Sequence, residues 1–278
     1  MTSPPGRCLV MGIVNRTPDS FYDGGRMDLG EAIDFALGLV EEGADVLDVG
    51  GVKGGPGAEV AEREELDRVV PLIAALSGST GAPLSVETGR PNVARRALEA
   101  GASWVNDVTA LADADLAGVC ADAGTALVLT HNGGQIRGRP RSPRYGDVVE
   151  AVIAEWRRLE TVARAAGVAP DRLVMDPGLD FGKTTFHSLE IMRRLGELVA
   201  VAGAVLVAPS RKDVVGESLG LPLGERLEGT LALVGLSVLR GAAVVRVHDV
   251  KAAVRTVRMV ETVIGRRRPR APVRGLWD

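Results

Sequence analysis

The sequence predicts a (β/α)8 barrel, an α/β fold in which each of eight parallel strands is followed by a helix. Three observations support this fold class. Short apolar runs recur eight times along the 278 residues, helical stretches separate them, and a polar residue closes each run. Runs that are apolar at nearly every position suit strands buried on both faces, as in sheets covered by helices. A doubly wound open sheet of eight strands is the alternative that these observations leave open.

The predicted strands are short and alternate with longer segments of helical periodicity. Segments such as LGEAIDFALGLVEEGA and PNVARRALEAGA place apolar residues on one helical face, and several end at Gly-Ala just before the next run. In chain order the strands are CLVMGIV (8–14), DVLDVG (45–50), PLSVE (83–87), SWVND (103–107), ALVLTH (126–131), RLVMD (172–176), AVLVAPS (204–210) and AVVRVHD (243–249). No linker rich in Pro, Gly or Ser divides the chain, so one domain is expected over residues 1–278, with a basic tail at about 265–278.

Composition indicates a soluble globular protein with small-molecule partners. Apolar residues make up 46% and charged residues 25%, whereas disordered chains contain fewer apolar residues. The net charge of −3 gives no basic surface of the kind that binds nucleic acid. Cys8 and Cys120 lie in apolar runs without zinc-site spacing and are expected to be buried and reduced. No apolar stretch reaches the roughly 18 residues of a membrane span, so we expect a cytoplasmic protein without a membrane partner.

Polar residues close all eight apolar runs. In a (β/α)8 barrel these ends meet at one face, which is where barrel active sites lie. One polar residue at a strand exit carries little information, but eight together predict a site. The residues are Asn15, Asp48, Glu87, Asn106 with Asp107, His131, Asp176, Ser210 with Arg211 and Lys212, and Arg246 with His248.

Three of these residues suit a flat, amide-rich heterocycle. The carboxylate of Asp176, in the segment MDPGLDFGKT, can accept two parallel hydrogen bonds from a ring edge of guanidine type. Asn106 offers both a donor and an acceptor. Lys212 can donate to a ring carbonyl or lay its aliphatic stem across the ring face. Together they predict a binding surface for such a ring.

Another three residues suit a diphosphate. Arg246 and His248 lie two positions apart on the last run, so their side chains point the same way. Asn15 closes the first run and can give Mg²⁺ an oxygen ligand, because magnesium is usually held by few protein ligands plus substrate phosphates. The alternative for Arg246 is an ion pair with Asp249 or another carboxylate at the barrel rim.

Six motifs between residues 11 and 250 resemble those of the dihydropteroate synthase family: MGIVNRTPDSFYDGG, DVGG followed by PG, WVNDV, MDPGLDFGKT, SRK and RVHDV. The resemblance implies a TIM barrel, usually a homodimer, that joins a pterin-methyl diphosphate to the aromatic amine p-aminobenzoate in folate biosynthesis, with Mg²⁺, and releases pyrophosphate. No catalytic nucleophile is expected, because positioning and charge neutralisation suffice. The implied site residues are Glu87, Asn106, Asp176 and Lys212 for the pterin, Asn15, Arg246 and His248 for the diphosphate, Asn15 for the metal, and Thr17, Lys53 and Arg211 for the acceptor and loops.

The sequence departs from the family pattern near the acceptor and the loops. The second loop reads GGVKGGPG (50–57) where the family usually has GGESTRPG, so Lys53 is its only charged side chain. Glu87 replaces the Asp of a Val-Asp-Thr motif. Asp213 replaces a Ser near the helix start expected to receive the benzoate, where its charge should repel that substrate. Three interpretations stay open: a synthase, a diverged pterin-binding homologue with little turnover or another acceptor, and a pterin-dependent methyltransferase barrel.

Overall fold

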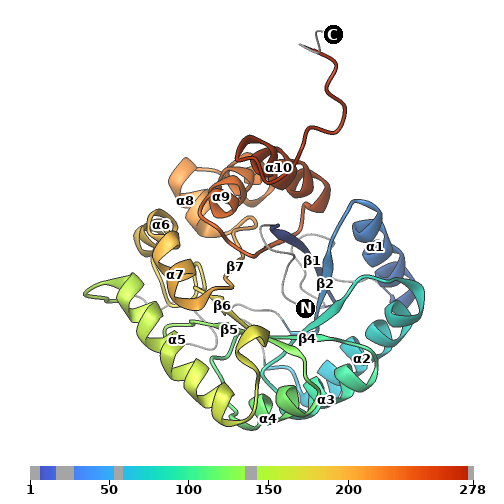
Figure 1. Cartoon of the computed structure of the whole chain (residues 1–278). Helices are drawn as coiled ribbons and strands as arrows, with labels where there is room; N and C mark the ends of the chain where they lie inside the picture. The colour runs from blue at the N-terminus through green and yellow to red at the C-terminus, as the bar shows by residue number, and fades with distance from the viewer. Residues whose placement is uncertain (1–6, 17–27, 53–58, 135–142, 275–278) are drawn as a thin grey trace.

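Eight parallel strands form a barrel ringed by helices in the computed structural model, which describes residues 7–16, 28–52, 59–134 and 143–274 (Figure 1). The strands are β1 (Leu9–Asn15), β2 (Val46–Gly50), β3 (Leu84–Glu87), β4 (Trp104–Asp107), β5 (Ala126–Thr130), β6 (Leu173–Asp176), β7 (Leu206–Val207) and β8 (Val244–Val247). The helices are α1 (Leu29–Glu41), α2 (Glu62–Ser79), α3 (Pro91–Glu99), α4 (Asp115–Asp122), α5 (Val148–Ala165), α6 (Thr185–Arg193), α7 (Leu195–Ala202), α8 (Asp213–Leu219), α9 (Leu227–Leu239) and α10 (Val250–Val263). The predicted strand-helix order is therefore confirmed.

The sheet closes on itself. Its strand order is β6-β5-β4-β3-β2-β1-β8-β7, and a parallel bridge between Met175 and Val205 joins the two outer strands. There the Met175 amide donates to the carbonyl oxygen of Ala204 at 3.0 Å. This closure excludes the doubly wound open sheet. The seventh strand is shorter than the predicted run at 204–210, because Pro209 within that run has no amide hydrogen to donate to a ladder.

Two apolar layers hold the barrel together. The outer layer lies between the strands and the helices, and the inner layer lines the amino-terminal half of the barrel. Along each strand, alternate side chains face the interior. On five strands an inner-layer residue is therefore followed two positions later by an inward-facing polar residue: Val46 by Asp48, Trp104 by Asn106, Val128 by Thr130, Val174 by Asp176, and Val244 by Arg246. The fold thus separates an apolar lower barrel from a polar upper mouth.

Local sequence signals explain how helices begin. Asp28 precedes α1 and accepts a hydrogen bond from the Glu31 amide at 2.9 Å, while Glu31 accepts one from the Asp28 amide at 3.0 Å. This reciprocal pair satisfies amides that the first helical turn leaves without partners. Asp147 caps α5 in a similar way, accepting from the amides of Val149 and Glu150.

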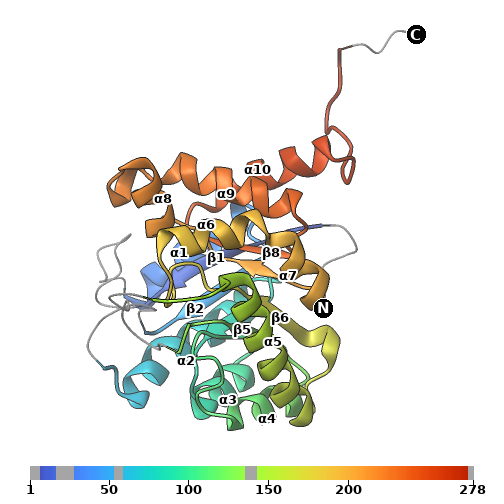
Figure 2. The same cartoon turned by 90° about the vertical axis from the view of Figure 1, so that its left-hand side faces the viewer.

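Several other expectations concern burial and the chain end. Cys8 and Cys120 are buried free thiols, as predicted. Residues 265–274 are exposed and lead away from the barrel (Figure 2), while 275–278 lie outside the described residues. In the part of the chain that the structure describes, no helix has the length and apolar character needed to cross a membrane.

Truncation of the β5 side chain Leu127, which is fully buried, should destabilise the fold. We expect Leu127→Ala to lower the free energy of unfolding by about 2–5 kcal/mol, because the cavity relaxes only in part. Leu219→Ala on α8 is the matched control, since Leu219 is 54% exposed and its loss should cost less than about 1 kcal/mol. Urea unfolding of both variants measures the difference, and equal losses would contradict the burial assignment.

Candidate active site

A buried ionic cluster crosses the carboxyl end of the barrel. Arg246 of β8 donates from Nε to Oδ2 of Asp48 at 2.6 Å and from Nη2 to Oε2 of Glu87 at 2.5 Å. Nδ2 of Asn106 donates to the same Asp48 oxygen at 3.0 Å. Side chains from β2, β3, β4 and β8 therefore meet at one point. The sequence left open that Arg246 forms an ion pair with Asp249 or another carboxylate at the barrel rim. The structure shows such ion pairs, with Asp48 and Glu87 instead of Asp249.

Four buried oxygen atoms around this cluster have no hydrogen-bond partner among the described residues. They are Oδ1 of Asp48, Oγ of Ser85, Oδ1 of Asn106 and Oγ1 of Thr130. A buried polar atom without a partner costs about 1–3 kcal/mol, so such atoms are rare and are usually satisfied by bound water or by a ligand. Since all four can accept, the mouth suits a ligand rich in N–H or O–H donors.

Asp176 and Lys212 lie on the opposite side of the mouth. Oδ1 of Asp176 accepts from the Gly178 amide at 2.7 Å, and burial raises the pKa of Asp176 while Lys212 opposes that rise. Burial lowers the pKa of Lys212, with Asp176 opposing. Nζ of Lys212 donates to the Leu179 carbonyl at 2.8 Å and lies 4.8 Å from the centroid of the Phe181 ring. The predicted pair is thus brought together, beside an aromatic face.

Lys183 is a site residue that the sequence analysis missed. Its buried Nζ lies 2.7 Å from Nδ1 of His131 and donates to the carbonyl oxygens of His131, Gly178 and Phe181 at 2.9–3.0 Å. These contacts fasten the loop after β6 to the end of β5. Burial lowers the pKa of Lys183 to about 7 and that of His131 to about 3. The sequence signal for Lys183 was its place in the segment MDPGLDFGKT, after the glycines at 178 and 182.

His248 and Arg211, predicted to bind the diphosphate and the acceptor, have partners within the chain. Nδ1 of His248 lies 2.9 Å from Oγ of Ser210. Arg211 donates to both carboxylate oxygens of Asp249, at 2.9 and 2.7 Å. Oδ1 of Asn15 lies beside Gly50 at the end of the neighbouring strand. Thr17 and Lys53 lie outside the described residues, so their roles stay predictions.

The start of α8 was expected to receive the acceptor carboxylate. There Oδ2 of Asp180 accepts from the amides of Asp213 and Val214, at 2.6 and 3.2 Å. Asp213 is itself paired with Arg226 at 2.8 Å, so its charge is compensated in a way that the sequence did not show. Asp180 is a second residue that the sequence analysis missed, and its backbone lies in the left-handed region, with φ 66°.

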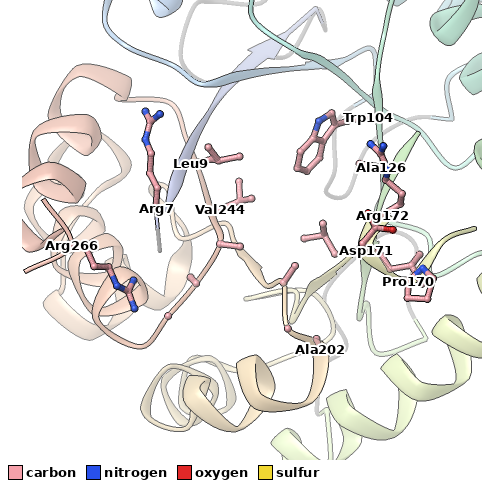
Figure 3. Close-up of a pocket in the computed structure, with 17 residues that line it drawn as sticks. Arg7, Leu9, Trp104, Ala126, Pro170, Asp171, Arg172, Ala202, Val244 and Arg266 are labelled. Atoms are coloured by element: carbon pink, nitrogen blue, oxygen red, sulfur yellow. The ribbon is translucent and has the colours of Figure 1, made fainter. Parts of the chain in front are cut away.

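A separate hollow of about 400 Å³ opens at the other end of the barrel (Figure 3). Leu9, Trp104, Leu173 and Val244, which line it, are the first residues of their strands. Its lining carries three arginines and one aspartate but none of the buried amide and carboxylate oxygens found at the mouth. It therefore does not suit the donor-rich heterocycle predicted from the sequence.

Comparison with known proteins agrees with this geometry. Residues 11–248 match the family described as pterin binding enzyme. The chain is 47% identical over 277 residues to the inactive dihydropteroate synthase 2 of Mycobacterium tuberculosis, covering 97% of this chain and 87% of that protein. The Yersinia pestis dihydropteroate synthase structure with a sulfonamide drug is 36% identical, with a TM-score of 0.91 and coverage of 96% and 97%. The Xanthomonas albilineans dihydropteroate synthase structure with 4-aminobenzoic acid is 40% identical, with a TM-score of 0.86 and coverage of 96% and 94%.

The barrel with its polar mouth and the matched residues define a class, the TIM barrels of pterin-binding enzymes. Relatives of that class at this level of identity carry the name dihydropteroate synthase, some of them with the qualifier inactive. The chain belongs to the pterin-binding enzyme family, as a diverged member of the dihydropteroate synthases.

Glu87 should give the stability a pH dependence near neutrality. Burial raises its pKa to about 7, helped by Asp48 on β2 and Glu65 on α2 and opposed by Arg246 on β8 and Lys212 before α8. Because this pKa lies above its ordinary value, the folded chain holds the Glu87 proton more tightly than the unfolded chain does. The stabilisation is complete at pH values below the unfolded pKa and is lost as pH rises through about 7.

The free energy of unfolding of the wild type should therefore fall relative to that of Glu87→Gln as pH rises from about 5 to about 8. Glutamine has nearly the same shape but does not titrate in this range. Urea unfolding of both proteins at several pH values measures the difference. Parallel pH profiles would show that Glu87 keeps an ordinary pKa in the folded chain.

Proposed function

We propose that this chain binds a reduced pterin at the carboxyl ends of its strands and acts as a dihydropteroate synthase-type transferase. The donor would be 6-hydroxymethyl-7,8-dihydropterin diphosphate, the acceptor p-aminobenzoate and the leaving group pyrophosphate. The observation that carries the proposal is the set of buried acceptors around Asp48, Asn106 and Asp176. A pterin edge presents amide and amine donors to such a set, and its ring carbonyl can accept from Lys212.

The described residues support positioning and charge neutralisation instead of covalent catalysis. Asp176 would hold the guanidine-type edge of the ring, and Lys212 and Phe181 would fix the plane of the ring. The buried mouth excludes water, which strengthens these electrostatic contacts during displacement at the pterin CH₂ group. Arg246 and His248, at the end of the last strand, would face the departing diphosphate.

Mg²⁺ fits this donor set as an ion held mainly by substrate phosphate oxygens, with the side-chain oxygen of Asn15 as the protein's ligand. In the residues that the structure describes, no group of three His, Cys, Asp or Glu side chains could hold a metal ion. When bound, the ion would neutralise charge on the leaving diphosphate. Pyrophosphate binding with and without Mg²⁺ tests this part of the proposal without an activity assay.

A second candidate function is pterin binding with little synthase turnover. The Glu87–Arg246 ion pair favours it, because the guanidinium expected to meet the diphosphate already faces two carboxylates. Several relatives of this chain carry the name inactive dihydropteroate synthase 2. The methyltransferase alternative has no comparable support in the described residues.

We also propose a cytoplasmic homodimer. The buried free cysteines agree with a reducing compartment. Large apolar side chains are exposed on α9 and α10, namely Leu239, Met259 and Val263, and these helices lie side by side on the outside of the barrel (Figure 1). Exposed apolar side chains on neighbouring elements are typical of subunit contacts. Light scattering after size exclusion would measure the mass.

Pyrophosphate release tests the synthase directly. The full chain is mixed with the pterin diphosphate and Mg²⁺, and p-aminobenzoate is added while pyrophosphate is followed by a coupled assay. Release that depends on the acceptor supports the transferase. Tight pterin binding without release supports the second candidate, and the absence of binding by any reduced pterin would contradict both.

The contribution of Asp176 is tested by Asp176→Asn. The amide keeps the shape but accepts through only one oxygen, so pterin affinity should fall by about tenfold or more. Asp171→Asn, at the opposite end of the barrel, is the matched control and should bind pterin as the wild type does. Calorimetric titration measures both, and unchanged affinity in Asp176→Asn would remove that residue from the site.

A further inference from the structure

Three features of the mouth that can bind an anion each face a carboxylate of the chain itself. Arg246 faces Asp48 and Glu87. Arg211 is bonded through two nitrogens to Asp249. The first amides of α8 are bonded to Asp180. Among the described residues, the mouth therefore supplies its own counter-anions.

The pairing of Glu87 with Arg246 matters for the leaving group, because Arg246 is the residue predicted to bind the diphosphate. Two of the three guanidinium nitrogens, Nε and Nη2, are engaged by carboxylates. Asp48 is fully buried and Glu87 is 9% exposed, so solvent screens this pairing little. A diphosphate arriving beside Arg246 would meet two negative groups within contact distance of the same guanidinium, and these repel it.

The Glu87 carboxylate can reach Arg246 because of the length of its side chain and because Gly50 has no side chain in the way. The strand order β3-β2-β1-β8 places two strands between Glu87 and Arg246. Gly50 ends the first of these, and a Cβ built there would lie 3.8 Å from Cβ and 3.9 Å from Oε1 of Glu87. The Glu87 side chain thus passes over a strand end that has no side chain of its own. An aspartate, shorter by one methylene, would end about 1.5 Å nearer its own strand.

We propose that Glu87 is a specificity-determining residue that acts as an internal counter-anion for Arg246, so that the site binds reduced pterins with an uncharged side chain at least as tightly as pterin diphosphate. The inference rests on the proposed pterin site and names its ligand class. The diphosphate ester enters only when the Glu87 carboxylate leaves Arg246. An uncharged hydroxymethyl pterin leaves the pair intact and still meets the unpartnered acceptors of Asp48 and Asn106.

Calorimetric titration of the full chain at about pH 8.5, where Glu87 with a pKa of about 7 is ionised, tests the proposal. The three probes are the uncharged hydroxymethyl pterin, its diphosphate, and inorganic pyrophosphate, the last two with Mg²⁺. The proteins are the wild type, Glu87→Gln and Glu87→Asp. Both variants should bind pyrophosphate about tenfold or more tightly than the wild type does, because one carboxylate is removed or withdrawn from Arg246. Glu261→Gln is the matched control, a buried glutamate whose Oε1 accepts from the Cys8 amide at the other end of the barrel.

The outcomes separate this proposal from the proposed function. Unchanged pyrophosphate affinity in folded Glu87 variants would overturn the counter-anion role, even if pterin binds. If no pterin form binds, the proposed function fails. The comparison of pyrophosphate affinity between the wild type and the Glu87 variants still tests whether Glu87 acts as a counter-anion for Arg246. The wild type alone gives a test that needs no variant: a diphosphate ester that binds more tightly than the uncharged pterin would overturn the proposal.

Discussion

The guanidinium of Arg246 connects parts of the chain that are far apart in sequence. Its partners Asp48 and Glu87 come from β2 and β3, and Asn106 of β4 joins through the same Asp48 oxygen. Because the barrel is closed, these strand ends cannot move apart without breaking the ladder between them. The polar mouth is therefore as rigid as the sheet that carries it, and unpartnered oxygens within it keep fixed positions. Fixed acceptors lose little entropy when they bind a flat ring.

The loop after β6 provides the other half of the mouth. Nζ of Lys183 binds this loop to His131 at the end of β5. The Asp180 carboxylate binds the loop to the start of α8 by accepting from the Asp213 amide. Phe181, between these two anchors, lies against Lys212. The side chains proposed to face a bound ring, Phe181 and Lys212, are thus positioned by groups that do not themselves have to touch a ligand. Substitutions at the anchors should alter binding through Phe181 and Lys212, in the manner of outer residues that orient a site.

The barrel and its polar mouth could be predicted, because eight short apolar runs alternate with helical segments and a polar residue closes each run. Asp176, Asn106, Arg246 and Lys212 accordingly meet at one mouth. The partner of Glu87 could not be predicted, since Arg246 is 159 residues away and the contact needs both barrel closure and the missing side chain of Gly50. The site roles of Lys183 and Asp180 were not predicted for another reason. Both side chains bond mainly to backbone groups of loops that contain residues in the left-handed region, and hydrophobic periodicity does not reveal such loops.

The buried charges at the mouth are better explained by ligand binding than by stability. Removing carboxylates and a guanidinium from water costs several kcal/mol per ion, and apolar replacements of buried ion pairs are often neutral or stabilising. A barrel that only needed to fold would gain little from Arg246 and two carboxylates, least of all with Oδ1 of Asp48 left without a partner. In the cluster the charge of Arg246 is compensated by Asp48 and Glu87, yet Oδ1 of Asp48 and Oδ1 of Asn106 have no hydrogen-bond donor among the described residues. That combination selects ligands by their donors and excludes those whose main contribution is negative charge.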